Sequence, residues 1–404
     1  MKKLLEIALG VVTGIGGFLE VGSLATSAQA GSEFGFQLLW VLALGVVCIT
    51  FLVEMSGRLA ALSHHTIPDA MRERFGLRFF LVPLVAVTLV SFLVLASEIG
   101  GVCLALQLAT GVRFQWWAPL VALAAWLLLW KGTFGLVEKG SSLLGLVSLV
   151  FLVGAWKLHP PLAPIAAGLA PSLPGHDPAR YWFLAVSILG ASVSPYLFYF
   201  YSAGAVEDEW DEGYLAVNRV TAGLGMGFGG VLSAAVVVVA AMVFLPRGIQ
   251  IQRYEQMALL LTDPLARWGF ILFVATLAVT CLGATLEISL ELAYLVAQGF
   301  GWHWGENLKP REAARFSLVY TLVIPLAACL MLVGIDPLKL TNFSMALTAV
   351  SLPVTVVPML VLMNDPHYVG ERGNGWISNA AVLAVSLVAC VIALAAIPLQ
   401  LLGS

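Results

Sequence analysis

Long apolar runs alternate with short polar connections over the whole chain. A helix needs about 20 mostly apolar residues to cross the hydrocarbon core of a bilayer, and eleven runs of this chain meet or approach that length. They lie at 5–28, 36–62, 79–110, 114–131, 137–158, 181–205, 219–246, 266–300, 312–334, 338–363 and 377–401. The pattern predicts an all-α integral membrane protein with eleven spans and no extramembrane domain.

Composition supports a membrane protein and excludes several other classes. Of the 404 residues, 60% are hydrophobic and 11% are charged, and the mean hydropathy is +0.96. Soluble domains contain about 25% charged residues, so lipid must cover the apolar surface of this chain. A net charge of −3 does not favour nucleic acid as a partner. The 5 cysteines lie in apolar runs without a Cys-x-x-Cys pair, so neither a disulfide framework nor a zinc site is indicated, and no cofactor is expected.

The N-terminal segment and the basic residues predict an orientation. The first residues, MKKLLEIALGVVTGIGG, resemble a signal peptide, but Glu6 and the glycine-rich continuation predict a retained first span. With the N-terminus in the cytoplasm, thirteen Lys and Arg residues lie on the inner side and seven on the outer side. By the positive-inside rule this predicts a multi-pass protein of the cell (inner) membrane with its C-terminus outside.

Two spans contain residues that interrupt helices. The first span reads GIGGFLEVGSLAT at 14–26, with Glu20 and Gly22 inside it, and the sixth reads LGASVSPYLFYFYS at 189–202, with Gly190 and Pro195. Glycine and proline destabilise a helix interior. Unwound backbone at membrane depth is tolerated only where it lines a cavity or is buried in protein.

The two interrupted spans are five apart, and each begins a half of five spans. We therefore expect a first repeat at about 5–158, a second at about 181–363 and an extra helix at about 377–401, all in one transmembrane domain of residues 1–404. Interrupted spans at matching places of inverted halves are typical of the substrate site of secondary transporters. Close helix packing explains the glycines equally well, but it does not explain a carboxylate and a proline at matching depths.

Several long stretches resemble one family in the same order. They are GSLATSAQAGSEFGFQLLW (22–40), EMSGRLAAL with IPDAMRERF (54–75), SEIGGVCLALQLATG (97–111) and SLPVTVVPMLVLMNDPHYVGERGNGWISN (351–379). From about 10 to 380 the chain is similar to the Nramp family of divalent-metal transporters. This resemblance implies a LeuT-type fold, with ten helices in two inverted halves plus an eleventh, and a transporter rather than an enzyme.

The binding motifs depart from the family pattern. Where the family has Asp-Pro-Gly-Asn in the first span, this chain has Glu20-Val21-Gly22-Ser23, and where it has Met-Pro-His in the sixth, this chain has Ser194-Pro195-Tyr196. Tyr201 matches a second histidine, Met345 matches a span-10 glutamine and Leu95 matches a third-span aspartate tied to proton movement. The metal ligands that the resemblance implies are at Glu20, Ser23, Ser194, Tyr196 and Met345.

These changes alter the chemistry of the implied site. A methionine thioether favours soft or borderline metals, and Ser194 removes it. The remaining oxygen ligands suit hard cations, and Mg²⁺ often keeps several waters when bound. The expected substrate is a hard divalent cation, Mg²⁺ or Mn²⁺ rather than Fe²⁺, with proton coupling altered or absent. The Nramp-related magnesium transporters have also altered these binding positions, and the chain resembles that branch in this respect.

Three further acidic residues lie inside predicted spans. An ionised side chain there costs about 2.5–3.5 kcal/mol on insertion scales, so it usually has a function. Glu98 lies in the third span, and Glu287 and Glu291 lie four residues apart in the eighth, on one helix face. They form a candidate ion or proton pathway. The alternative is that each is protonated and hydrogen-bonded within the structure. By contrast, Glu54 and Arg58 predict a structural ion pair.

Three other functions compete with metal transport. The same fold could carry an organic cation or an amino acid, with Tyr196 in an aromatic wall, or the protein could have lost metal transport. A membrane enzyme or receptor is not supported, because the chain has no Gly-x-Ser-x-Gly, His-Glu-x-x-His or phosphate-loop motif. The sequence does not define the oligomeric state, and a monomer is the expectation.

Overall fold

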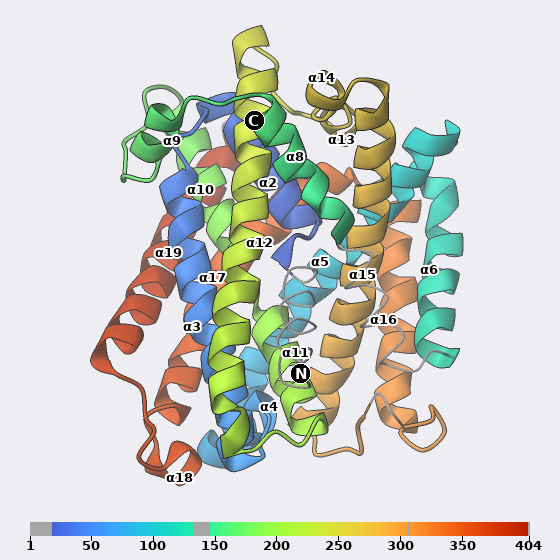
Figure 1. The fold of residues 1–404 in the computed structure, drawn as a ribbon. Helices are drawn as coiled ribbons and strands as arrows, with labels where there is room; N and C mark the ends of the chain where they lie inside the picture. Colours follow the sequence, from blue (N-terminus) through green and yellow to red (C-terminus); the bar gives the residue numbers. More distant parts are fainter. Residues whose placement is uncertain (1–17, 132–145, 306–307, 403–404) are drawn as a thin grey trace.

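The protein is a bundle of long helices, described here in a computed structural model for residues 18–131, 146–305 and 308–402 (Figure 1). The helices run along one common direction, and short helices lie at both ends of the bundle (Figure 1). The bundle is built from α2 (Val21–Phe34), α3 (Leu39–Ser63), α5 (Leu77–Thr110), α6 (Phe114–Lys131), α8 (Val150–Lys157), α10 (Pro178–Ser192), α11 (Pro195–Glu207), α12 (Leu215–Val243), α15 (Arg267–Gly299), α16 (Ala314–Leu332), α17 (Pro337–Leu362) and α19 (Trp376–Leu402).

Shorter elements connect the long helices. They are α4 (Ile67–Phe75), η1 (Leu146–Leu149), α9 (Leu162–Gly168), η2 (Glu212–Tyr214), η3 (Leu245–Arg247), α13 (Tyr254–Met257), α14 (Thr262–Leu265) and α18 (Pro366–Val369). In Figure 1, α4 and α18 lie at the lower end of the bundle, and α9, α13 and α14 lie at the upper end.

The hydrophobic runs predicted the long helices closely. The predicted span 114–131 coincides with α6, and 338–363 and 377–401 each differ by a residue at their ends from α17 and α19. Within the described ranges, eight helical spans are long and apolar enough to cross a membrane. The predicted first span at 5–28 and fifth span at 137–158 begin outside the described residues. The first three glycines of the stretch 14–26 also lie outside them.

Burial separates a central group of helices from a peripheral one. All 14 residues of α2 are buried, and in the span Pro178–Glu207, which holds α10 and α11, 94% of the most apolar window is buried. For α16 and α19 the corresponding shares are 39% and 28%. Because exposed Leu and Val side chains cover those two helices, lipid is their expected solvent, and α2, α10 and α11 form the protein-enclosed centre.

The sixth span is broken where the sequence predicted a break. Helix α10 ends at Ser192 and α11 begins at Pro195, so the 30-residue span divides into parts of 15 and 13 residues. Proline has no N–H to bond the preceding turn, and it forces the residue before it out of the helical region. Ser194 accordingly has φ −75° and ψ 125°, an extended conformation.

The described part of the first span begins at a second break. Residue 18 is helical, residue 19 forms a bend, and Glu20 is extended with φ −97° and ψ 178° before α2 starts at Val21. Helix α2 packs mainly on α12 and α10. Both breaks therefore lie among buried helices, where irregular backbone is tolerated in a membrane.

The lower end of the bundle is held by polar contacts. Residues 67–75, which the sequence placed in a loop, form the short helix α4, because Thr66 caps its N-terminus by accepting from the Asp69 N–H at 3.4 Å. The predicted Glu54–Arg58 ion pair is confirmed at 3.0 Å. Arg58 also donates to the carbonyl of Arg372 and to Asn374, so this pair joins α3 to the segment before α19.

Candidate functional site

The carboxylate of Glu98 closes the N-terminus of α2. The first helical N–H, that of Val21, donates to Glu98 Oε1 at 3.0 Å, although the two residues are 77 positions apart. The first N–H groups of a helix have no partner inside the helix, and a negative charge there is favoured by the helix dipole. Glu98 is 0% exposed, so α5 supplies this cap from inside the protein.

Glu20 lies directly before that helix end and is buried. Its side chain is 1% exposed, and its carboxylate oxygens lie beside the side chains of Tyr196 and Glu98 without a hydrogen bond of regular geometry to a described residue. Its main electrostatic neighbours are Tyr196, Glu98 and Glu287, from α11, α5 and α15. Burying a carboxylate without a compensating group is costly. Glu20 and Glu98 therefore form an acidic pair at the first break that a cation would stabilise.

Met345 joins the two breaks. A Cβ added at Gly22 would lie 2.6 Å from the Met345 sulfur and 3.1 Å from a carboxylate oxygen of Glu20. A Cβ added at Gly190 would lie 1.8 Å from the Met345 carbonyl oxygen. Both glycines therefore allow close approach, with the Met345 side chain against α2 and its backbone against α10. The structure brings Glu20, Gly22, Gly190 and Met345 together.

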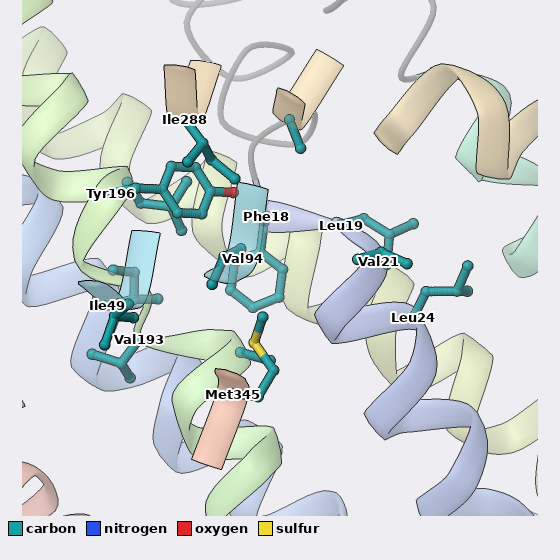
Figure 2. Close-up of a cluster of buried hydrophobic side chains, with 14 of the residues drawn as sticks. Phe18, Leu19, Val21, Leu24, Ile49, Val94, Val193, Tyr196, Ile288 and Met345 are labelled. Atoms are coloured by element: carbon teal, nitrogen blue, oxygen red, sulfur yellow. The ribbon is translucent and has the colours of Figure 1, made fainter. Parts of the chain in front are cut away.

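The second break contributes Ser194, Tyr196 and backbone carbonyls. Ser194 is 1% exposed, and its hydroxyl does not cap α11. Among the described residues, no backbone N–H donates to the carbonyls of Gly190, Ala191 or Ser192, at the end of α10. Figure 2 shows the side chains of Tyr196, Phe18 and Met345 in one buried cluster, each from a different element. This break therefore offers neutral oxygen atoms, whereas the first offers charge.

Ser23 stabilises the first break from within its own helix. Its hydroxyl donates to the carbonyl of Phe18 at 2.9 Å. This bond crosses the extended residue Glu20 and satisfies a carbonyl that the break would otherwise leave free. The oxygen atom of Ser23 retains lone pairs for a further partner.

The two acids of α15 lie in different surroundings, although they share a helix face. Glu287 is half-buried and interacts electrostatically with Glu20 and Tyr196. Glu291, one turn further along, is 0% exposed and lies beside Ser91 of α5 and Tyr199 of α11. Only Glu287 of this pair thus belongs to the group around the breaks. Glu291 lies one helical turn from Glu287, toward the end of α15 near α4.

One neighbour of the acidic pair gave no functional signal in the sequence. Cys281 of α15 is fully buried beside Glu98, and a Cβ on Gly101 would lie 2.5 Å from its sulfur. A lone cysteine in an apolar run resembles ordinary core. In the ranges 18–131, 146–305 and 308–402, no three His, Cys, Asp or Glu side chains are grouped to hold a metal ion. A cation between the breaks would need carbonyl, hydroxyl or water oxygens in addition to carboxylate.

A comparison with protein families identifies the family of the chain. The family described as Nramp, natural resistance-associated macrophage protein-like, matches residues 10–398. The chain belongs to the Nramp family. That Glu20 and Ser194 correspond to the family's first-span and sixth-span motifs stays a prediction from the sequence resemblance.

Curated relatives of this Nramp protein cover most of its length. The divalent metal cation transporter MntH of Deinococcus radiodurans is 26% identical over 394 residues, which cover 91% of this chain and 86% of the relative. The protein of the same name from Vibrio campbellii is 25% identical over 403 residues, covering 96% and 90%.

Solved structures confirm the predicted fold. A variant of the Eremococcus coleocola manganese transporter superposes with a TM-score of 0.75 at 18% identity and covers 98% of this chain and 87% of that one. The transporter Mhp1 in a closed conformation gives 0.63 at 14% identity, with 96% and 91% covered, and MhsT with L-phenylalanine gives 0.61 at 15%, with 96% and 97% covered. The Nramp protein is thus an all-helical, multi-pass membrane transporter with the LeuT-type fold, and it is not an enzyme.

Proposed function

We propose that this protein transports a divalent metal cation, and that the cation is a hard one, Mg²⁺ or Mn²⁺, bound between the two helix breaks. The relatives MntH are named for divalent metal cations and the structural neighbour for manganese. The observation that carries the proposal for this chain is the buried side chain of Glu20, which lies beside Tyr196 and the acids Glu98 and Glu287 with no basic residue among its principal neighbours.

The charge around Glu20 favours a cation over other substrates. Glu98 and Glu287 are among its electrostatic neighbours, and none of its principal neighbours is basic. Several acids without a compensating base attract positive ions and repel anions. The N-terminus of α2 also points at this place, and its positive dipole end would oppose a cation. The Glu98 carboxylate at the Val21 N–H offsets that effect.

The ligand set supports a hard cation. The proposed ligands are the carboxylate of Glu20, the hydroxyls of Ser23 and Ser194, and carbonyls at the end of α10, with Tyr196 as a hydrogen-bond donor at the edge. Oxygen ligands and bound waters suit Mg²⁺ and Mn²⁺. The thioether sulfur of Met345 lies against Gly22 and is a softer donor than the proposed oxygen ligands. It would therefore add a weak preference for Mn²⁺.

We also propose that proton coupling is altered or absent. Leu95, where the family resemblance places a proton-linked aspartate, is 0% exposed and apolar. Among the acids along the helices, the candidates for a proton path are Glu98, which caps α2, and Glu287 and Glu291 on α15. We assign Glu287 to the cation site and Glu291 to a path leading away from it, since it lies beside Ser91 and Tyr199.

The remaining proposals concern topology. The halves at about 5–158 and 181–363 would move relative to each other around the fixed site, and the helix at 377–401 would lie outside both halves. The positive-inside count places the N-terminus in the cytoplasm and the C-terminus outside. The α4 and α18 end of the bundle would then face the cytoplasm.

Uptake by reconstituted protein tests the proposed site. Proteoliposomes containing the wild-type protein should take up Mn²⁺ or Mg²⁺, and Glu20→Ala should abolish uptake. Glu54→Gln is the matched control, because Glu54 belongs to an ion pair at the end of α3, and it should leave uptake close to wild type. Uptake by Glu20→Ala at the wild-type rate would contradict the site assignment. Stabilisation of the wild type by amines or amino acids, but not by metal ions, would favour the organic substrate instead.

A further inference from the structure

A groove lies between the ends of α17 and α19, far from the helix breaks in the sequence. Its volume is about 880 Å³. It is lined by the last turns of α17, by the connection that follows and by the first turns of α19, with Arg74 from α4. Both helices are apolar enough to cross a membrane. The groove therefore lies where two spans leave the bilayer on the same side, the lower end in Figure 1.

The walls of the groove are apolar on the side that faces lipid. Val357 and Val361 of α17 are 41% and 40% exposed, and Leu383 of α19 completes this wall. Trp376, at the start of α19, is 78% exposed. Tryptophan at this position is typical of the level of lipid headgroups. The apolar part of the groove thus lies along the two spans, where lipid acyl chains are expected.

The end of the groove beyond the apolar wall is polar and carries both signs of charge. Arg74 Nε donates to Asp365 Oδ2 at 2.7 Å, and no other described residue accepts from the terminal nitrogens of Arg74. The side chains of Asn364 and Asn379 bond to each other at 2.9 Å, so they close this end without leaving an unpaired amide. The backbone N–H of His367 and then the Arg74 side chain hold the pKa of Asp365 below its ordinary value, and Asp365 is therefore ionised at neutral pH.

We propose that this groove is a binding site for a zwitterionic phospholipid with a primary ammonium group, phosphatidylethanolamine, whose phosphate lies at Arg74 and whose ammonium lies at Asp365. A basic pocket at a span end normally selects anionic lipids. Here Asp365 cancels the charge of Arg74, so an anionic headgroup gains little. The quaternary ammonium of phosphatidylcholine has no N–H to donate to a carboxylate, which disfavours that lipid.

Native mass spectrometry of the full chain in mild detergent, titrated with each lipid, tests the proposal. The wild type should retain phosphatidylethanolamine in preference to phosphatidylglycerol and phosphatidylcholine. Arg74→Gln should lower retention about fivefold, the effect of one basic residue near a membrane surface. Asp365→Asn should reverse the preference toward phosphatidylglycerol, because Arg74 then remains uncompensated. Arg247→Gln is the matched control, since Arg247 pairs with Asp263 and is similarly half-exposed at the other end.

A second variant keeps the test valid if loss of the Arg74 pair unfolds this end of the protein. Leu383→Trp fills the groove and leaves Arg74 and Asp365 intact, and it should also reduce retention, with an unchanged elution volume and melting temperature. Equal retention of all three lipids by the wild type, or an unchanged preference in Asp365→Asn, overturns the proposal. A dimer without bound lipid also overturns it, because a second copy would then cover the groove.

Discussion

The two helix breaks occupy matching places in the inverted halves, but they are built from different chemistry. At the first break a carboxyl group stands on each side: Glu20 precedes α2, and Glu98 accepts from its first N–H, that of Val21. At the second break no charged side chain is present, and α11 begins at Pro195, which has no N–H to satisfy. The first break therefore supplies carboxyl groups, and the second supplies an interrupted helix with neutral oxygen atoms.

This difference shows how an inverted repeat can form one asymmetric site. Two helix N-termini at one place produce a positive potential, which suits an anionic substrate. Here the acids of the first break oppose that positive potential. Pro195 at the start of α11 has no N–H, so the second break has one fewer unpaired donor. A cation substrate then requires only one of the two breaks to carry carboxylates.

The largest expected effect on stability comes from the glycines beside the two breaks. Gly190 contacts rigid backbone, whereas Gly22 contacts a flexible side chain. Gly190→Ala would place a methyl 1.8 Å from the backbone carbonyl of Met345, whereas Gly22→Ala would meet the flexible end of the Met345 side chain. We expect Gly190→Ala to lower the free energy of unfolding by about 3 kcal/mol or more and Gly22→Ala by about 1 kcal/mol. Thermal unfolding in detergent measures both. Gly223→Ala, where the added methyl meets nothing within 4 Å, is the control.

Loss of the Glu98 cap on α2 should have the next largest effect on stability. Glu98→Leu leaves the Val21 N–H without an acceptor, and we expect a loss of about 1–3 kcal/mol of unfolding free energy. Glu98→Gln keeps a carbonyl oxygen in the same place and should lose less than half as much. Melting temperatures of the two variants measure this difference in stability. If they are equally stable, Glu98 does not act as the cap.

The two acids of α15 should differ in their effect on cation affinity. Glu287 interacts with Glu20 across the site, whereas Glu291 has Ser91 and Tyr199 as neighbours. Glu287→Gln should weaken Mn²⁺ binding about fivefold, for roughly 1 kcal/mol of lost attraction. Glu291→Gln should leave binding nearly unchanged and slow transport. Equal affinities in titration calorimetry of the two variants would remove Glu287 from the site.

The smallest effect concerns selectivity at the second break. Ser194→Met restores the thioether that the family pattern has there, without changing the charge of the site. Softer ions gain from a thioether, so the ratio of Cd²⁺ to Mg²⁺ affinity should rise by about tenfold, or 1.4 kcal/mol. An unchanged ratio would mean that Ser194 does not face the bound ion. Ser192→Met, at the end of α10, serves as a comparison.

The sequence predicted most helix lengths and the breaks near Glu20 and Pro195, because apolar runs and a proline act locally. Gly22 and Gly190, which were predicted as break residues, lie inside α2 and α10 and instead let Met345 approach closely.

The sequence did not predict partners between distant segments. The bond from Val21 to Glu98 and the place of Cys281 beside Glu98 depend on how the helices are rotated about their axes. The hydropathy of a span that is apolar all round does not reveal that rotation. For the same reason the spacing of Glu287 and Glu291 put them on one face but gave no difference in their neighbours.

Titration calorimetry of Mn²⁺ and Mg²⁺ against the wild type and Glu20→Gln tests the central claim most directly. Glutamine keeps the size of the side chain and removes its charge. The account predicts one saturable site in the wild type and an affinity at least about 30-fold lower in the variant, the effect of losing one partner of a buried charge pair. Equal affinity in the two proteins, with both folded as judged by their melting temperatures, would contradict the assignment of the cation to the first break.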